Sequence, residues 1–297
     1  MPAHPLSPPW LSPPADAVAL PAHVWPSSAR RGPDGAITIG GVAVTRLAAE
    51  FGTPLYVVDE QDARARAART LAAFTAAAAA HDTSTVVYYA GKAFLCAEAA
   101  RWMVAEGLNI DVASGGELAV ALAAGVEPAR LGLHGNNKSV AEIERAVGVG
   151  VGAIVIDSLI EIERVAAAAE RHGRVQPVRL RINSGVHAHT HEYLATARED
   201  QKFGIPISDA PAAVAAIRAH ASLRFLGLHS HIGSQIFAVE GFLEAARRLL
   251  TLHAELRAGG DVPELNLGGG FGIAYVESDE APEIEHVAEA LLSAVAS

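Results

Sequence analysis

Cysteine is nearly absent from this sequence, since Cys96 is the single one among 297 residues. One cysteine cannot form a disulfide within the chain, which predicts a reducing compartment such as the cytoplasm. The N-terminus lacks a basic segment followed by an apolar one, so we expect no signal peptide. No apolar run reaches the ~20 residues that a helix needs to cross a bilayer. These absences predict a cytoplasmic protein without a membrane partner.

Charge is also sparse, and it is mostly negative. Charged residues make up 19% of the chain, and the formal net charge is −10. This balance argues against a general nucleic-acid binder, although a local basic site could still hold a phosphate. Hydrophobic residues make up 51% of the chain, which is enough for a large buried core. We therefore expect a soluble globular protein.

The first part of the chain changes character near residue 35. Residues 1–34 contain nine prolines and little periodicity, which predicts an irregular arm. The segment 36–44 predicts a hairpin that turns at Gly40–Gly41, and 45–51 predicts a short helix. Leu55–Asp59 predicts a further strand, and the Ala-rich segment 61–80 predicts a helix.

From residue 86 onward, short apolar runs end in polar residues at a regular interval. The polar residues at these ends are Lys92, Asp111, His134, Asp157 and Arg181, which are 19, 23, 23 and 24 residues apart. Helical stretches lie between them, so the pattern predicts repeated βα units with a parallel sheet. Two more units follow, one that ends near His229 or His231 and one that ends before Gly268–Gly270. A long polar loop is expected at about 185–207.

Seven βα units predict a (β/α)8 TIM-like barrel that lacks its eighth unit. An open doubly wound sheet is the alternative. We favour the barrel because polar residues end every strand and because no Gly-rich dinucleotide turn follows the first strand. In a barrel all these strand ends would face one cavity. No metal site is expected from these residues.

Lys92 is the residue with the strongest chemical implication. Its stem follows the apolar run 86–90, and desolvation of a lysine lowers its pKa and favours Schiff-base formation. Gly268–Gly270 allows backbone N–H groups to approach an anion, and the turn Ser230–Ser234 lies one unit earlier. A Schiff-base lysine combined with a phosphate site fits pyridoxal phosphate.

Each residue also has a structural interpretation, since Lys92 could simply end a strand, Asp157 could cap a helix, and Ser114 with Glu117 forms a capping-box pattern.

Several ordered motifs resemble the barrel-type, alanine-racemase-like pyridoxal-phosphate decarboxylases, and among them the diaminopimelate decarboxylases of the actinobacterial kind. The resemblance runs from about Val24 to the end of the chain. The motifs that carry it lie at Tyr89–Cys96, Asp111–Leu118, His134–Ser139, Ala188–Glu192, Glu199–Gly204, His229–Gln235 and Leu267–Gly272.

The resemblance implies a role for each candidate residue. Lys92 would hold pyridoxal 5'-phosphate as a Schiff base, and His231 would stack on the pyridine ring. Ser234 and the three glycines Gly268, Gly269 and Gly270 would bind the phosphate. The ring pocket would be shaped by Asp111, Glu117 and Arg181, and the substrate side by His134, Asn136 and Asn137. Lys202 would lie near a homodimer contact.

The implied reaction converts meso-2,6-diaminopimelate to L-lysine and CO2, the last step of lysine biosynthesis. A relative that acts on ornithine, arginine or carboxynorspermidine is an alternative, as is a non-catalytic barrel that carries the cofactor. A Schiff-base aldolase barrel without cofactor is disfavoured because its lysine usually lies on a later strand. The stretches 134–139 and 229–235 favour diaminopimelate.

The resemblance also predicts how the chain is divided. Residues 1–34 would form the arm, 35–58 the N-terminal piece of an all-β domain, and 59–297 a barrel truncated before its eighth strand. The family's later Glu-Pro-Gly-Arg stretch, Cys-Glu-Ser-Gly motif and tyrosine do not occur here. We therefore expect weak cofactor retention, poor solubility and little lysine formation from the 297 residues alone.

Overall fold

The computed structural model describes residues 8, 16, 18–186 and 203–296, which fall into two compact units. The smaller unit contains the described residues up to Asp62 together with Ala274–Asp279, and the larger unit contains the remainder. The motif at 188–192, Lys202 and the first part of the motif at 199–204 lie outside the described residues.

The small unit contains a three-stranded antiparallel sheet and one helix. Its strands are β1 (Arg30–Arg31), β2 (Ile37–Ile39) and β3 (Val42–Ala43), in that order across the sheet. The turn between β2 and β3 is Gly40–Gly41, with positive φ values of 59° and 79° that glycine adopts readily. The predicted hairpin at 36–44 and the following helix α1 (Val44–Phe51) are confirmed. β1 lies in the stretch that was predicted to be irregular.

The strand predicted at Leu55–Asp59 is wrong. Within the described residues no strand pairs with this segment, and Tyr56 is 96% exposed. Apolar residues alone do not form a strand, because a strand needs hydrogen bonds to a neighbour. The Asp59 carboxylate instead accepts hydrogen bonds from the backbone N–H groups of Gln61 and Asp62. The segment therefore ends as the cap of helix α2 (Glu60–Ala80).

The large unit is built on seven parallel strands. They lie side by side in the order in which they occur along the chain. The strands are β4 (Tyr88–Ala90), β5 (Asn109–Val112), β6 (Leu131–Leu133), β7 (Ala153–Ile156), β8 (Gln176–Asn183), β10 (Leu223–His229) and β11 (Glu264–Asn266), and the short β9 (Ile205–Pro206) pairs with the end of β8.

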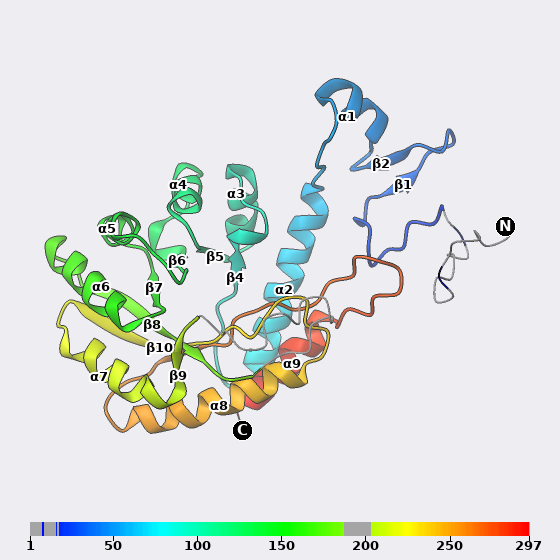
Figure 1. Cartoon of the computed structure of the whole chain (residues 1–297). Helices are drawn as coiled ribbons and strands as arrows, with labels where there is room; N and C mark the ends of the chain where they lie inside the picture. Colours follow the sequence, from blue (N-terminus) through cyan, green and yellow to red (C-terminus); the bar gives the residue numbers. More distant parts are fainter. Residues whose placement is uncertain (1–7, 9–15, 17, 187–202, 297) are drawn as a thin grey trace. The chain divides into compact units, whose positions relative to one another are not determined.

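Helices connect these strands and cover the outer face of the curled sheet (Figure 1). The sheet order never reverses, whereas a doubly wound fold reverses it at a switch point. The seven strands form a curled half-barrel, as the barrel prediction requires. The helices are α3 (Ala97–Ala105), α4 (Gly115–Ala123), α5 (Val140–Val149), α6 (Leu159–Arg171), α7 (Ala210–Ala219), α8 (Glu240–Arg257) and α9 (Ile284–Ala296).

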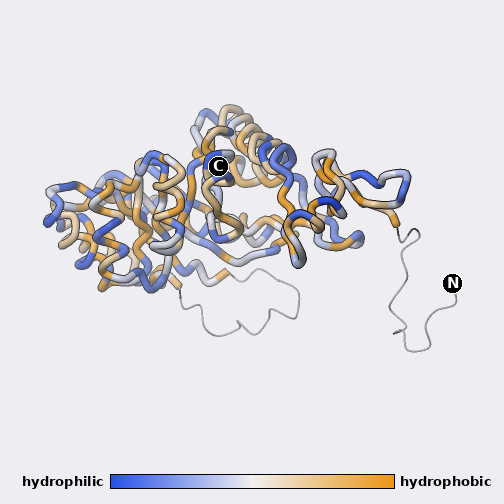
Figure 2. Tube along the Cα trace, turned by 90° about the horizontal axis from the view of Figure 1, so that it is seen from above, coloured by the Kyte–Doolittle hydropathy of each residue, from blue (hydrophilic) through white to orange (hydrophobic). Residues whose placement is uncertain are grey.

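Alternate residues of each strand point outward against the helices and are apolar. Successive strand residues point to opposite faces, so one apolar set per strand is enough to bind the helix layer. Figure 2 shows the resulting succession of apolar and polar residues along the chain. The outward side chains, none more than 2% exposed, are Ile110, Val112, Leu131, Leu133, Ile154, Ile156, Val178, Leu180, Ile182 and Leu228.

The residues between them point inward and, apart from Val155 of β7, are polar or small. Arg179 of β8 shows how far this polarity extends from the strand ends. Its guanidinium lies 2.6 Å from the Glu264 carboxylate of β11 and 3.4 Å from the Tyr88 hydroxyl of β4. β4 and β11 stand at opposite ends of the strand order. One buried arginine therefore contacts both outer strands from inside the curled sheet.

Candidate functional site

The carboxyl ends of the seven strands meet at one edge of the sheet, which we call the mouth. The parallel register places Asp111 beside Gly132 and Arg181 beside His229. The other strand-end residues follow their strands directly: Lys92 after β4, His134 after β6, Asp157 after β7, His231 after β10, and Gly268–Gly270 after β11. The fold thus brings candidate residues from the ends of seven separate strands to one edge.

Lys92 lies in a short 3-10 turn, η1 (Gly91–Ala93), directly after β4. The Tyr89 hydroxyl donates a hydrogen bond of 2.6 Å to the Phe94 carbonyl across this turn. Lys92 itself is exposed. β4 is at the end of the described strand order and pairs with a neighbour on one side, β5.

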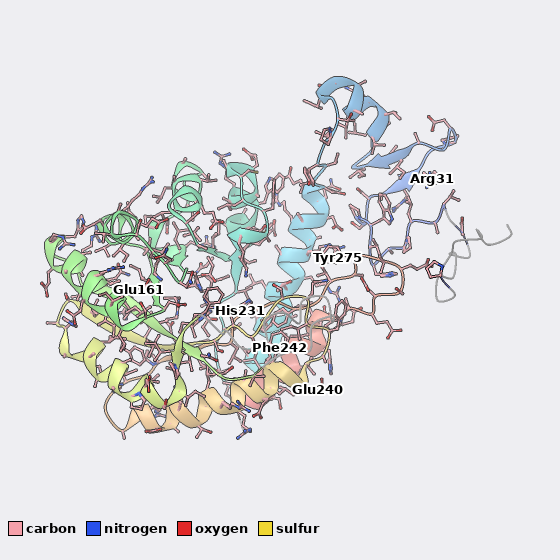
Figure 3. All side chains as sticks on the ribbon, viewed as in Figure 1. Arg31, Glu161, His231, Glu240, Phe242 and Tyr275 are labelled. Atoms are coloured by element: carbon pink, nitrogen blue, oxygen red, sulfur yellow. The ribbon has the colours of Figure 1, made fainter. Side chains whose placement is uncertain are left out.

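His231 lies beside Lys92 and is kept neutral. The pKa of His231 is lowered to about 4, chiefly by burial and then by the positive charges of Lys92 and Arg181, while a hydrogen bond with the Gly269 backbone acts in the opposite direction. Figure 3 shows His231 among the side chains on the inner side of the sheet. At neutral pH its imidazole therefore presents an uncharged ring to the mouth.

Asp111, His134 and His229 form a second polar group inside the mouth. The Asp111 Oδ1 and His134 Nε2 atoms are 3.0 Å apart, yet they are not aligned for a hydrogen bond and both remain without one. The His134 and His229 rings meet edge to face, with centroids 5.0 Å apart. Gly132 makes room for this group, since a Cβ there would lie 2.4 Å from the Asp111 carboxylate.

His229 was left as an alternative to His231, and the structure separates the two. His229 is 3% exposed, and its Nδ1 has no hydrogen bond. Burial, followed by the charges of the neighbouring histidines and arginines, lowers its pKa well below the usual value. The two-residue alternation after the outward Leu228 is the signal that places His229 inside.

The glycine turn after β11 packs against the turn after β10 through backbone alone. Gly268 and Gly270 have positive φ values of 72° and 102°. A Cβ on Gly270 would lie 1.9 Å from the Gly233 carbonyl oxygen, and one on Gly268 would lie 2.3 Å from that of Ser230. A side chain on either glycine would separate the two turns. Gly269 faces open space, so its backbone is accessible to a ligand.

Arg181 is engaged by protein groups at the mouth. Its guanidinium lies 3.3 Å from the Asp157 Oδ1 atom and 4.9 Å from the centre of the Phe203 ring. The other Asp157 oxygen accepts a hydrogen bond of 3.1 Å from the Gly204 N–H. Asp157 does not cap its helix, and the Ser158 side chain at the N-cap makes no capping bond either. Asp157 therefore joins β8 to the chain that returns at 203–204.

Glu117 is used at the start of α4. Its backbone N–H donates to the Ser114 hydroxyl, and its carboxylate accepts a hydrogen bond of 2.6 Å from the Ala113 N–H. The capping interaction is therefore present, with the carboxylate bonded to Ala113 rather than to the N-cap residue. The structure leaves three other candidates exposed at the mouth, namely Asn136, Asn137 and Ser234.

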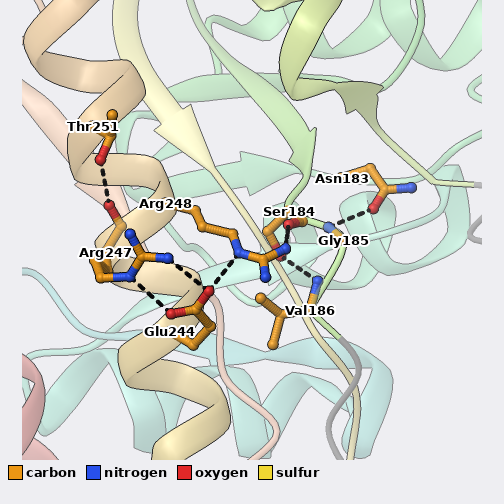
Figure 4. A network of polar contacts seen from close by, with 8 residues as sticks. All are labelled: Asn183, Ser184, Gly185, Val186, Glu244, Arg247, Arg248 and Thr251. Atoms are coloured by element: carbon orange, nitrogen blue, oxygen red, sulfur yellow. Dashed lines mark hydrogen bonds and ion pairs between the residues drawn. The ribbon is translucent and has the colours of Figure 1, made fainter.

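The chain that leaves β8 is fastened to α8 (Figure 4). Arg248 donates hydrogen bonds to the Ser184 carbonyl at 2.9 Å and to the Glu244 carboxylate at 2.7 Å. Hydrogen bonds from Arg247 and Arg248 lower the pKa of Glu244 to about 2. The hydrogen bond from Arg248 to Ser184 therefore fixes the backbone shortly before residue 187. The hydrogen bond from Gly204 to Asp157 fixes it shortly after residue 202.

Among the described residues, no group of three or more histidine, cysteine or acidic side chains is arranged to hold a metal ion. No helix in the part of the chain that the structure describes is long and apolar enough to cross a membrane.

Comparisons with known proteins agree on one family. The family described as "Pyridoxal-dependent decarboxylase, pyridoxal binding domain" matches residues 66–297. The diaminopimelate decarboxylase of Mycobacterium tuberculosis is 49% identical over 280 residues, which cover 92% of this chain and 61% of that protein. That of Mycobacterium leprae is 49% identical over 304 residues, which cover 99% of this chain and 62% of that protein.

A solved structure shows the same arrangement. The diaminopimelate decarboxylase from M. jannaschii, in co-complex with L-lysine, aligns with a TM-score of 0.82 at 30% identity, covering 91% of this chain and 62% of that one. The chain thus spans about three fifths of the length of the relatives it matches. Since the family match extends over most of the chain and includes every strand of the curled sheet, the chain belongs to the pyridoxal-dependent decarboxylases and contains their pyridoxal-binding domain.

Proposed function

We propose that this protein takes part, with pyridoxal 5'-phosphate, in the decarboxylation of meso-2,6-diaminopimelate to L-lysine and CO2. The observation that carries the proposal is the meeting of Lys92, His231 and the glycine turn at one mouth. Relatives that are 45–49% identical are named diaminopimelate decarboxylases, which supports this substrate. We further propose that the whole protein acts in the cytoplasm as a homodimer, as the family resemblance implies.

The residues at the mouth fit this cofactor. The paired glycine turns form a cradle that a Cβ would fill, and the open backbone at Gly269 suits a phosphate. Ser234 is exposed nearby in the neighbouring turn and would donate a hydrogen bond to the same group. Among the lysines that the structure describes at the mouth, Lys92 is exposed, so its amine is accessible to the cofactor aldehyde.

His231 would lie against the pyridine ring as a neutral group. When bound, pyridoxal phosphate supplies an electron sink for the pair of electrons that the departing CO2 leaves behind. A cationic imidazole would oppose positive charge on the ring nitrogen, and the low pKa of His231 avoids that repulsion. Asp111, Glu117 and Arg181 would shape the pocket around the ring, and His134, Asn136 and Asn137 would face the substrate.

The substrate assignment is tested by product analysis. The chain is loaded with pyridoxal phosphate and incubated separately with meso-diaminopimelate, ornithine and arginine. We expect lysine from the first and no amine from the other two. A parallel sample carries, in addition, the part of the M. tuberculosis relative that this chain does not match, and it should form lysine faster. Amine formation from ornithine or arginine by either sample would contradict the assignment.

The attachment residue is tested by borohydride reduction. Reduction of the pyridoxal-phosphate-loaded chain followed by peptide mapping should label Lys92, and Lys92→Ala should abolish the label. Lys92→Arg keeps the positive charge but cannot form the bond, so it separates loss of attachment from loss of charge. A label on Lys138 would show that the wrong lysine has been assigned.

The phosphate site is tested with two substitutions in the paired turns. Gly270→Val should weaken cofactor binding strongly, since a Cβ would meet the Gly233 carbonyl. Ser234→Ala should weaken it by about 10- to 100-fold, which corresponds to the roughly 1.5–3 kcal/mol of a hydrogen bond to a charged group. Gly116→Val, in the first turn of α4, is the control for inserting valine elsewhere. Unchanged cofactor affinity in both site variants would place the phosphate in another part of the protein.

The neutral state of His231 predicts a dependence of stability on pH. An unfolded histidine titrates near pH 6.5, whereas the folded pKa of His231 is about 4. Between these values the unfolded chain binds the additional proton, so the free energy of unfolding falls as the pH is lowered from 6.5 toward 4. His231→Asn should reduce this slope by up to ~1.4 kcal/mol per pH unit in urea titrations. His286→Asn, exposed on α9, is the control, and equal slopes in parent and His231→Asn would contradict the neutral assignment.

A further inference from the structure

A buried ion pair lies directly behind the mouth and has no role in the proposed chemistry. The Lys138 Nζ and Glu161 Oε2 atoms are 3.0 Å apart, and both side chains are 2% exposed. Lys138 stands just before α5, and Glu161 lies in the first turn of α6. The pair therefore connects the loop after β6 with the loop after β7.

Each partner also holds backbone at the mouth. The Lys138 ammonium donates a hydrogen bond to the Gly135 carbonyl. The same Glu161 oxygen accepts a hydrogen bond of 2.7 Å from the Asp157 N–H. Asp157 in turn holds Arg181 and Gly204, as described above. The pair thus joins three strand ends in one continuous polar network.

Stability alone is a poor explanation for this pair. Two charges that leave water lose their hydration, and an apolar pair of similar volume is often as stable or more stable. Burial lowers the pKa of Lys138, and the Glu161 carboxylate opposes that change. The ammonium is already bonded to two acceptors inside the protein, so it is not an accessible amine for a cofactor.

What the pair fixes in space is the turn Gly135–Asn137. Gly135 has a φ of +116°, and its carbonyl points inward to Lys138. With this carbonyl held, Asn136 and Asn137 remain exposed at the mouth, directly after His134. These are the three residues that the proposed function places on the substrate side.

We propose that Lys138 and Glu161 are positioning residues that hold the turn Gly135–Asn137 and thereby set the affinity for the amino-acid substrate. Lys92, Ser234 and the Gly268–Gly270 turn, which would hold the cofactor, lie at other strand ends, and the pair reaches the ring pocket only through Asp157 and Arg181. Cofactor binding should therefore depend on this pair much less than substrate binding does. The identity of the substrate in this inference rests on the proposed function. The claim that the pair holds the turn does not depend on the proposed function.

The test separates stability from positioning through a double variant. Lys138→Met with Glu161→Met removes both charges together, so neither is left buried alone, and the melting temperature should stay within a few degrees of the parent. Lys138→Met alone should lower the melting temperature, since it leaves the Glu161 carboxylate unpaired. Glu144→Met with Arg171→Met, which removes a more exposed pair between the same two helices, is the matched control.

Three measurements are made on parent, double variant and control. Amide hydrogen exchange at 135–137 should accelerate at least tenfold in the double variant alone. Pyridoxal phosphate binding, measured by absorbance, should weaken by less than threefold. The KM for meso-diaminopimelate, or the dissociation constant of L-lysine, should rise about tenfold with little change in kcat. Glu161→Gln, which keeps an acceptor for the Asp157 N–H, is the milder variant if the double variant does not fold, and should raise the same constants about threefold.

Each outcome tests a different part of the proposal. Parent-like amide exchange in the double variant would overturn the positioning of the turn, whatever the substrate is. Faster exchange with unchanged amino-acid affinity would overturn the link to substrate binding. Failure of the parent chain to bind pyridoxal phosphate would instead contradict the proposed function and leave the exchange result valid.

Discussion

The alternation of side chains along the parallel strands is the constraint on which the rest of the structure depends. Each strand binds the helix layer through its outward set, such as Leu131 and Leu133 of β6, which are fully buried. That leaves the inward set free to be polar. Arg179, Asp111 and His229 can therefore lie inside the curled sheet without weakening the apolar core. The polar site on the inner face is possible because the outward apolar side chains are enough to bind the sheet to the helices.

The inner polar groups are organised by the first turns of the helices. Glu117, Glu142 and Glu161 each accept a backbone N–H from the loop before their own helix or before a neighbouring one. Glu142 holds the start of α4 in the preceding βα unit, and Glu161 pairs with Lys138 of the preceding unit, so these two glutamates join neighbouring loops, whereas Glu117 holds its own loop. The loops are thus held by charge-assisted hydrogen bonds, while the strands beneath them are held by apolar packing.

The sequence predicted the periodic part of the structure well. The interval between polar strand ends predicted the order of strands, and the motifs predicted which residues share the mouth. Local signals failed where tertiary pairing decides, as at Leu55–Asp59, where an apolar run has no partner strand among the described residues. The Lys138–Glu161 pair lay beyond prediction, because a residue in the loop after β6 and a residue on α6 meet only once the curvature of the sheet is known.

The central claim is that the mouth holds pyridoxal 5'-phosphate on Lys92. The most direct test is a crystal structure of the protein grown with this cofactor. The account predicts continuous electron density from Lys92 Nζ to the cofactor, the ring against His231 and the phosphate on the Gly268–Gly270 turn. Cofactor density joined to another lysine, or a phosphate bound away from the paired glycine turns, would contradict it.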